Sequence, residues 1–507
     1  MDFQVLGNYI NGHFVEVKED VEGECNKTSP ADLKDNIGTF RYSFHSVDKA
    51  VDAARKAFKN WQLTPFEEKK NLLLKFKSLL EKNHDRLEDI ICREVGKPLW
   101  ETKTEIKSMV NKIDITLKEG LDVIKPFEVQ NAARSALGRC RYKPRGVLAV
   151  LGPFNFPGHL PNGHIIPALV TGNCIVFKPS ELTPGSGQLY TEIIHQAGFP
   201  KGVFNLIQGE GRIGSYLVKH PDIDGILFTG SYDTGCKIEQ ETFHDYWKTR
   251  ALEMGGKNAT IILADADLNK ALADTILSSY LTTGQRCSAT SRIMLHKGIA
   301  SEFIERFHAL SKDLIIDHPY AEKFDRKTPF MGPLINDKAE EKYLKFQDMA
   351  TREGAEKIMR GKKLERKPQG YYVSPSIYLV KEPNPKSVFQ QTEIFAPCVS
   401  IYTIDNTDHA IEIANQTTYG LALSVFTASE KEYEKIFQLS RTGIVNWNTG
   451  TVGASSKLPF GGILKSGNDR PSALFATQYC TYPVAELIDT TSLDTTQLPP
   501  GLNWKEK

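Results

Sequence analysis

Residues 145–180 read RGVLAVLGPFNFPGHLPNGHIIPALVTGNCIVFKPS. Two short apolar runs in this stretch are separated by enough residues for a helix, which is typical of a strand–helix–strand unit. Similar runs follow, so that five occur along the chain: Val147–Leu151, Cys174–Phe177, Val203–Ile207, Gly225–Phe228 and Thr249–Leu252. Five buried strands alternating with helices predict an α/β fold with a doubly wound parallel sheet. Because ligands bind outside the carboxyl ends of such strands, we expect the functional residues directly after these runs.

A second α/β series begins after Asn258. Its clearest predicted elements are a strand at Ala259–Leu263, a helix from about Asp267 to Thr283, and strands near Ile293–His296 and at Ala422–Phe426. We therefore expect a second doubly wound domain. Residues 126–145 and 471–490 fit neither series, and we interpret them as an arm that crosses to another subunit.

The first third of the chain is predicted to be mainly helical. Thr64 and Glu67 bracket Pro65 as a capping box, with proline at the first helical position. A later helix is predicted to stop at Gly96, just before Pro98.

Composition bounds the class of protein. A length of 507 residues predicts two or three domains. The net charge of +1 gives no electrostatic reason to expect nucleic acid or an anionic membrane as a partner. No apolar run approaches the roughly 20 residues of a membrane span, and no secretory signal is recognised at the start. The eight cysteines form no CxxC pair or Cys/His cluster, so we expect free thiols, no bound metal and a cytoplasmic protein.

Two glycine-containing loops follow predicted strands. Gly209-Glu-Gly211-Arg-Ile-Gly214 matches the GxGxxG pattern of dinucleotide sites. Phe228–Gly235 also runs from a strand into a helix, where a serine hydroxyl and helix N-terminal amides can hold a pyrophosphate. Either loop taken singly is equally well explained as a plain turn.

Lys178 and Glu181 end the second apolar run, where side chains can bind a ribose. A carboxylate at this place accepts hydrogen bonds from ribose hydroxyls and repels a 2′-phosphate, which favours NAD over NADP. A solvated charge pair at a strand end is the simpler alternative.

Three further residues have the chemistry of a reaction centre. Glu253 precedes two glycines, which allow a close approach of backbone or ligand. Cys287 ends a predicted helix beside Arg286, in a polar setting that can stabilise a thiolate. The amide of Asn155, just past the first strand, can donate to an oxyanion. Each also has an ordinary reading, as a strand-end carboxylate, a packing thiol and a turn asparagine.

Seven motifs occur in order along the chain: LGPFNFP, FKPSELTP, LFTGSYDTG, LEMGG, GQRC, TEIFAP and LPFGG. Together they resemble the aldehyde dehydrogenase superfamily over almost the full length. The stretches NFPGHLPNGHIIPAL, GIVNWN, GASS and FGGILKSGNDRPSALFATQYCTYPVAEL are similar to one subgroup, the N-succinylglutamate 5-semialdehyde dehydrogenases of the bacterial arginine succinyltransferase pathway.

The resemblance implies a role for each candidate. Cys287 is expected to be the nucleophile, Glu253 the general base, and Asn155 the oxyanion donor together with the backbone N–H of Cys287. The expected cofactor is NAD. Its expected ligands are Lys178 and Glu181 at the adenosine ribose, the loop Gly230, Ser231, Tyr232, Asp233, Thr234 and Gly235 in preference to the GxGxxG loop, and Glu393 and Phe395 at the nicotinamide riboside.

The family fold also implies a domain plan. Residues 1–125 and 146–253 are expected to form the NAD-binding domain, and residues 254–470 the catalytic domain. Residues 126–145 and 471–490 are expected to form a small bridging domain that makes a homodimer or homotetramer. Residues 491–507 are expected to be a C-terminal tail.

The implied reaction is oxidation of an aldehyde to a free carboxylate through a Cys287 thioester, with N-succinyl-L-glutamate 5-semialdehyde as the expected substrate. The chain departs from the family at Ala396, where glycine is usual, and from the subgroup at Ser291 and Thr449, where basic residues are usual. Arg286, Arg292 and Arg470 are candidates to replace those charges, or else form structural salt bridges. The alternatives are oxidation of a different semialdehyde or a neutral aldehyde, and a non-catalytic relative.

Overall fold

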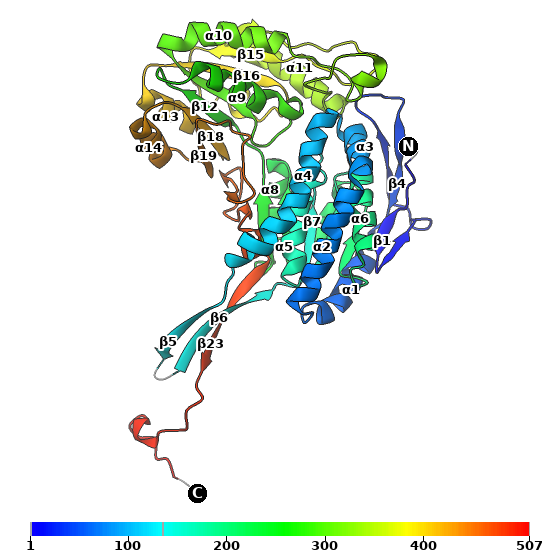
Figure 1. Cartoon of the computed structure of the whole chain (residues 1–507), viewed down its shortest axis with the longest axis vertical. Coiled ribbons are helices and arrows are strands. Elements are labelled where there is room, and N and C mark those ends of the chain that lie inside the picture. Colours follow the sequence, from blue (N-terminus) through cyan, green and yellow to red (C-terminus); the bar gives the residue numbers. More distant parts are fainter. Residues whose placement is uncertain (1–2, 134–135, 506–507) are drawn as a thin grey trace.

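The computed structural model describes residues 3–133 and 136–505. Two seven-stranded sheets, each covered by helices on both faces, form the body of the molecule (Figure 1). A smaller three-stranded sheet projects from one end. The predicted α/β fold with two doubly wound domains and a small additional sheet is therefore confirmed.

The first sheet has the strand order β11-β10-β7-β8-β9-β1-β2. Its five parallel strands are β7 (Val147–Leu151), β8 (Cys174–Lys178), β9 (Phe204–Leu206), β10 (Gly225–Thr229) and β11 (Thr249–Glu253). These match the predicted runs, because strands buried on both faces read as continuous apolar segments. In the register Leu151 lies beside Lys178 and Phe228, and Thr229 lies beside Glu253. The carboxyl ends therefore meet at one edge.

Helices cover both faces of this sheet. The helices α1 (Phe44–Trp61), α7 (Gly211–Lys219) and α8 (Tyr232–Glu241) lie on one face. The opposite face is covered by α5 (His159–Val170) and α6 (Pro184–Ala197), over which lie α2 (Phe66–Lys82), α3 (His84–Val95) and α4 (Leu99–Ile115). As predicted, α3 ends at Gly96, which takes the left-handed conformation with φ 81°.

The N-terminal segment differs from the prediction. Four strands precede α1: β1 (Asn8–Ile10), β2 (His13–Val15), β3 (Gly23–Thr28) and β4 (Asn36–Tyr42). The first two extend the large sheet as antiparallel edge strands, and three residues each are too few to show an alternating pattern. The capping box was also wrong. Pro65 is the N-cap of α2, and the Thr64 hydroxyl donates to the carbonyl of Asn60 instead.

The second sheet has the order β14-β15-β16-β13-β12-β18-β19. Its strands are β12 (Asn258–Ile262), β13 (Thr290–His296), β14 (Glu356–Met359), β15 (Ser376–Val380), β16 (Cys398–Ile404), β18 (Ala422–Phe426) and β19 (Ile444–Trp447). Only β14 is antiparallel to its neighbour. The long helices of this part are α9 (Leu268–Tyr280), α10 (Lys297–Lys312), α11 (Asp337–Arg352), α13 (Thr407–Asn415) and α14 (Glu430–Leu439).

Short elements complete the second half of the chain. They are α12 (Val388–Gln391), α15 (Ala476–Tyr479) and the paired two-residue strands β17 (Tyr419–Gly420) with β21 (Ile463–Leu464) and β20 (Pro459–Phe460) with β22 (Ser472–Ala473). The segment that follows β21 returns to β11, where Gly467 forms an isolated bridge with Glu253.

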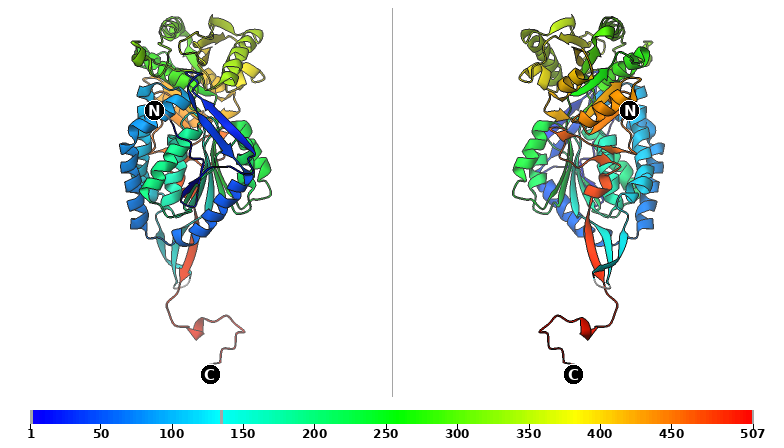
Figure 2. Two further views of the ribbon diagram at one scale, coloured as in Figure 1. Left: turned by 90° about the vertical axis from the view of Figure 1, so that its right-hand side faces the viewer. Right: turned by 90° about the vertical axis from the view of Figure 1, so that its left-hand side faces the viewer.

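The third sheet combines both segments that fit neither series. It pairs β6 (Ala136–Pro144) with β5 (Phe127–Ala133) on one side and with β23 (Thr481–Ile488) on the other. Figure 2 shows this sheet and the C-terminal tail at one end of the molecule and the second domain at the other. In the described ranges, no helix is long and apolar enough to cross a membrane.

Candidate active site

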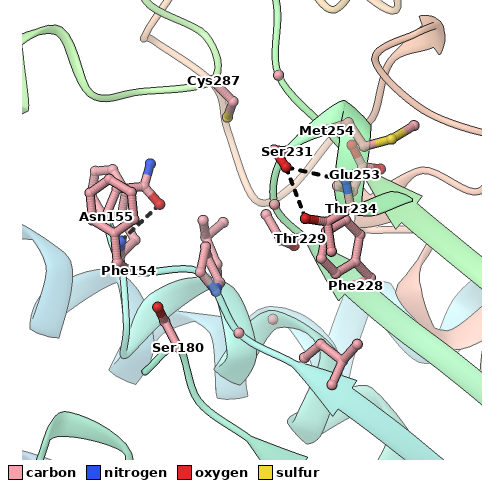
Figure 3. Close-up of a pocket in the computed structure, with 18 of the residues that line it drawn as sticks. Phe154, Asn155, Ser180, Phe228, Thr229, Ser231, Thr234, Glu253, Met254 and Cys287 are labelled. Atoms are coloured by element: carbon pink, nitrogen blue, oxygen red, sulfur yellow. Dashed lines mark hydrogen bonds between the residues drawn. The ribbon is translucent and has the colours of Figure 1, made fainter. Parts of the chain in front are cut away.

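One cavity of about 860 Å³ opens at the carboxyl edge of the first sheet, against loops of the second domain. Ten of the predicted site residues line it: Asn155, Lys178, Glu181, Gly230, Ser231, Thr234, Glu253, Cys287, Glu393 and Phe395. Asn155 and Cys287 come from two separate loops and Glu253 from the end of β11, and all three face the same space (Figure 3). The fold thus joins residues that are more than 130 positions apart in the sequence.

The loop that carries Cys287 is conformationally strained. Thr282 and Thr283 have φ of 54° and 57°, and Gly284 continues the left-handed run. Two β-branched residues in this region cost of order 1–3 kcal/mol each, so the surrounding contacts must hold them. Buried Glu101 does so, because its carboxylate accepts the Thr282 backbone N–H at 3.1 Å and the Thr282 hydroxyl. The prediction that Cys287 ends a helix was therefore wrong, because Cys287 follows a strained turn.

The surroundings of Cys287 raise the pKa of its thiol. Burial raises its pKa to about 12, with further raising by the charges of Glu393 and Glu253, while the Ser288 backbone N–H and Arg286 act in the opposite direction. The neighbouring Arg286 is engaged elsewhere. It pairs with Glu101 at 2.7 Å and donates to the Thr282 hydroxyl at 2.9 Å. Burial thus outweighs the predicted stabilisation of a thiolate by the polar setting.

Asn155 is bound to the loop that precedes Cys287. Its Nδ2 donates to the carbonyl oxygen of Gln285 at 2.9 Å, and its Oδ1 accepts the Phe156 backbone N–H. One of the two amide hydrogens remains for a ligand. The backbone N–H of Cys287 likewise donates to no acceptor within the described ranges. Two hydrogen-bond donors are therefore left free beside the sulfur.

Glu253 is a buried carboxyl at the end of β11. Burial raises its pKa well above the ordinary value, although the backbone N–H groups of Ser472 and Gly462 oppose this by donating to it. Its Oε2 has no hydrogen-bond partner among the residues the structure describes. An acceptor that is buried, unpartnered and at the cavity wall is able to take a proton from a bound molecule.

The two glycines after Glu253 bring protein groups together. A Cβ on Gly255 would lie 1.9 Å from Oε2 of Glu393, and a Cβ on Gly256 would lie 2.7 Å from the carbonyl oxygen of Cys287. The Gly256 N–H donates to Glu393 at 2.9 Å. Burial raises the pKa of Glu393 to about 7. These glycines therefore set the close approach of Glu253, Glu393 and Cys287.

Phe395 and Ala396 lie against the same strained loop. Phe395 has φ 61° and meets Phe154 edge to face with ring centroids 5.8 Å apart. A Cβ on Gly284 would lie 2.5 Å from the carbonyl group of Ala396, so the two backbones are in contact here. The Ala396 methyl group is buried and is accommodated in the core of the second domain.

Both glycine-containing loops open on the cavity. Ser231 caps α8 by accepting the Thr234 backbone N–H, and the N-terminus of that helix faces the cavity. Gly211 and Gly214 of the GxGxxG loop line the same space. Lys178 links the two regions, since its buried Nζ donates to the carbonyl oxygens of Pro179 and Gly209 at 2.8 and 2.7 Å. Burial lowers the Lys178 pKa, and Glu181, 3.8 Å away, opposes this.

Three predicted cofactor residues do not line the cavity. Tyr232 packs edge to face on Tyr419, Asp233 is exposed, and Gly235 contacts Met254, where a Cβ would lie 2.3 Å from the sulfur. Successive side chains point in different directions around the first turn of α8, so only Gly230, Ser231 and Thr234 of this loop reach the cavity. The other three shape and support that turn.

Two of the candidate cations are excluded from the cavity wall. Arg292 is buried and donates to the carbonyl oxygens of Lys257, Ile413 and Ala414, which makes it structural. Arg470 donates to the carbonyl oxygen of Asp469 at the surface. Ser291 and Thr449 are also absent from the lining of the cavity in the described structure.

Several cavity residues were missed by the sequence interpretation. They include the half-buried ring of His159 and four cations, Lys112, Arg212, Lys237 and Lys342. A polar stripe at positions 104, 108 and 112 of a predicted helix was the available signal for Lys112. His159 and Arg212 lie at helix starts, and Lys237 and Lys342 lie inside helices, where a single polar residue makes no distinctive pattern.

Comparison with known proteins identifies the family. The model of the aldehyde dehydrogenase family matches residues 17–483. The N-succinylglutamate 5-semialdehyde dehydrogenase of Erwinia tasmaniensis is 39% identical, with 90% of this chain and 91% of that protein covered. The protein of the same name from Legionella pneumophila (strain Paris) is 38% identical, with 98% of each covered.

A solved structure agrees with these sequence relatives. The 1-pyrroline-5-carboxylate dehydrogenase from Thermus with bound NAD is 30% identical and superposes with a TM-score of 0.88, over 96% of this chain and 93% of that chain. The predicted resemblance is confirmed, and the chain belongs to the aldehyde dehydrogenase family of oxidoreductases that act on aldehydes.

Proposed function

We propose that this enzyme oxidises N-succinyl-L-glutamate 5-semialdehyde to N-succinyl-L-glutamate with NAD, through a thioester on Cys287, in arginine catabolism. The observation that carries the proposal is the single cavity lined both by Asn155, Glu253 and Cys287 and by Lys178 and Ser231. The substrate is supported by the names of relatives that are 38–39% identical over nearly the whole chain.

The cofactor end of the cavity fits a dinucleotide. The N-terminus of the ten-residue helix α8 offers backbone N–H groups to a pyrophosphate, and Ser231 adds a hydroxyl. Lys178, Glu181, Glu393 and Phe395 also line the cavity. In this proposal the first two bind the adenosine ribose and the last two the nicotinamide riboside. NAD, when bound, supplies the hydride acceptor. Its presence in the Thermus relative supports this choice.

Cys287 begins the reaction as a thiolate. Its sulfur forms a bond to the aldehyde carbon, and the carbonyl electron pair moves to oxygen. The resulting oxyanion accepts hydrogen bonds from the free amide hydrogen of Asn155 and from the backbone N–H of Cys287. Bound NAD would accept the hydride that leaves this adduct, and the carbonyl would then re-form as a thioester on Cys287.

Glu253 completes the reaction as general base. Its unpartnered Oε2 takes a proton from water as the water oxygen bonds to the thioester carbon. The carbon–sulfur bond then breaks, which releases the carboxylate and restores the thiolate. The raised pKa of Glu253 makes it a stronger base than an exposed carboxylate once it is ionised.

The domain plan follows from the same proposal. Residues 1–125 and 146–253 bind NAD, and residues 254–470 carry the nucleophile. Residues 126–145 and 471–490 bridge subunits in a homodimer or homotetramer. This role is supported by β5, all of whose residues are exposed, and by Phe127 and Leu487, which are 55% and 65% exposed. Light scattering on the intact chain tests it, and a monomer at micromolar concentration would contradict it.

The decisive experiment measures NADH formation at 340 nm. Wild type and Cys287→Ser are compared on N-succinylglutamate semialdehyde, glutamate semialdehyde, succinate semialdehyde and simple aliphatic aldehydes. The expected result is Cys287-dependent turnover with the highest kcat/KM on the succinylated substrate. Cys287-dependent preference for another aldehyde would keep the mechanism and replace the substrate. Turnover that survives Cys287→Ser would overturn the mechanism.

A further inference from the structure

Lys112 is a buried lysine in the cavity wall. It lies on α4, one turn after Ser108 and two turns after Thr104, and all three side chains line the cavity. The residue is 2% exposed, and its Nζ donates to the carbonyl oxygen of Ala473 in β22 at 2.6 Å. Lys112 therefore contacts the strand pair β20–β22. It does not contact the two glycine-containing loops that are proposed to face the cofactor.

The charge of Lys112 is uncompensated. No ion pair joins it to a carboxylate anywhere in residues 3–133 and 136–505, and burial lowers its pKa to about 8. Other buried cations nearby are paired. Lys97 lies 2.6 Å from Glu105, and Arg286 lies 2.7 Å from Glu101. Because a buried charge is unfavourable without a counter-ion, Lys112 is poised to bind an anion that enters the cavity.

Most of the hydrogen-bond donors of the Lys112 ammonium group are also unused. Buried Lys178 and Lys248 have more acceptors, since each donates to two carbonyl oxygens and lies within 3.8 or 2.7 Å of a carboxylate. Buried Lys257 also has a single carbonyl acceptor, that of Phe389, but unlike Lys112 it does not line the cavity. Lys112 has the single contact to Ala473 among the described residues. An ammonium group has three N–H donors, so two remain.

His159 provides an independent observation at the same wall. It is the first residue of α5, which packs on α4, and its ring lines the cavity. Its Nδ1 is buried and has no partner in the part of the chain that the structure describes. Burial lowers its pKa to about 4; the charge of Glu105 opposes this shift and the charge of Lys112 adds to it. The His159 backbone N–H donates at 3.1 Å to Glu105, which lies about two turns before Lys112 on α4, so both residues belong to the same wall. The neutral ring has one N–H to donate.

We infer that Lys112 binds a carboxylate carried by the aldehyde substrate, and that His159 donates a second hydrogen bond to the same carboxylate. The inference rests on the proposed oxidation at Cys287 and deepens it. It assigns the substrate class as aldehydes that bear an anionic group. It also explains how the cavity selects such a substrate although Arg292 and Arg470 do not line it.

Steady-state kinetics on a charged and an uncharged aldehyde test this role. Wild type, Lys112→Met and Lys112→Arg are assayed on N-succinylglutamate semialdehyde and on pentanal. Lys107→Met is the matched control, because Lys107 lies on the same helix but is exposed. Lys112→Met is expected to raise KM for the charged substrate about 10- to 100-fold, with kcat and all pentanal parameters within about threefold of wild type. Lys112→Arg is expected to restore part of the loss.

A second measurement removes the dependence on turnover. Calorimetry on the Cys287→Ala protein measures binding of the product carboxylate, N-succinylglutamate, with and without Lys112→Met. Weakening by about tenfold or more supports the inference. Unchanged binding with an unchanged KM would overturn it while leaving the proposed function intact. If Lys112→Met does not fold, Lys112→Gln and Lys112→Arg are compared, and equal KM values would also overturn it.

The outcomes separate the two proposals. A wild type that prefers pentanal would refute both the proposed substrate and the role of Lys112. An equal loss on both aldehydes in Lys112→Met would refute substrate recognition alone, since it would show that Lys112 only supports α4 and β22.

Discussion

Asn155 Nδ2 lies 2.9 Å from the carbonyl oxygen of Gln285, two residues before Cys287. The side chain proposed to bind the oxyanion therefore also holds the loop that carries the nucleophile. A single amide group has both functions because it has two hydrogens, of which the protein uses one.

Replacement of Asn155 is expected to affect both functions. Asn155→Ala should lower kcat about 10²- to 10³-fold, the usual cost of losing one oxyanion donor. It should also change the rate at which iodoacetamide alkylates Cys287, since the Gln285 contact is lost. The Ser180→Ala variant of the same cavity, which keeps this contact, is the control. A normal kcat in Asn155→Ala would refute the assignment.

The reactivity of Cys287 in the free enzyme should depend steeply on pH. A pKa of about 12 means that the thiolate fraction rises about tenfold per unit between pH 7 and 9. Alkylation of the Cys287 peptide, followed by mass spectrometry, should therefore accelerate across this range without a plateau. Half-exposed Cys140 and Cys236 are internal references. A plateau below pH 8 would show that the free enzyme already holds a thiolate.

The sequence predicted the elements that lie around the site because of how they are buried. All residues of β7, β8 and β10 are buried, so each strand reads as an unbroken apolar run and its end can be located. Asn155, Lys178 and Gly230 follow those ends, and the parallel topology then places them at one edge. Family motifs supplied Cys287 and Glu393, whose positions no local pattern predicts.

Long-range polar contacts could not be predicted in this way. Glu101 bonds to Thr282 across 181 positions, and Lys112 bonds to Ala473 across 361 positions. Neither pairing leaves a periodic signal, because each depends on the placement of both domains. The short strands β1 and β2 were missed for a related reason, since tertiary pairing rather than local propensity determines them.

The ion pair between Arg286 and Glu101 should contribute strongly to stability. Glu101 is 1% exposed, and although burial raises its pKa, the charges of Arg286 and Lys97 outweigh burial and hold the pKa below its ordinary value. Arg286→Met leaves this carboxylate without its nearest counter-ion, which should cost about 3–5 kcal/mol in urea unfolding.

The contribution of this ion pair to the free energy of unfolding should depend on pH. Because the folded pKa of Glu101 is lowered, the stabilisation is present above the unfolded value of about 4.5 and is lost as pH falls through the folded value. The double variant Glu101→Gln/Arg286→Met should be more stable than Arg286→Met at pH 7. Equal stability of the double variant and Arg286→Met would contradict a buried negative charge on Glu101.

Glu181 should set the preference for NAD. Its carboxylate lines the cavity beside Lys178 and would repel a 2′-phosphate. Glu181→Gln is expected to raise kcat/KM with NADP at least about tenfold and to lower it with NAD. Glu239→Gln, on α8 but paired with Arg250 at 3.1 Å, is the control for loss of one negative charge. An unchanged ratio of the two cofactors would remove Glu181 from the ribose site.

Glu253→Gln should separate catalysis from stability. Its amide cannot take a proton from water, so thioester hydrolysis should slow about 10²- to 10⁴-fold. A stopped-flow burst of NADH, close to one per active site, should remain, since hydride transfer precedes hydrolysis. Loss of the burst would mean that Glu253 acts earlier, on the thiol.

The same variant should be more stable than wild type at neutral and alkaline pH. Burial raises the folded pKa of Glu253 well above its ordinary value, so the folded state keeps a proton that the unfolded chain releases above about pH 4.5. Wild type therefore loses stability as pH rises, and a glutamine does not titrate. The difference in unfolding midpoint should grow as pH rises above about 4.5 and level off only above the folded pKa. Exposed Glu302→Gln should show no such trend, and a trend of opposite sign for Glu253→Gln would mean that its carboxylate is stabilised in the folded protein.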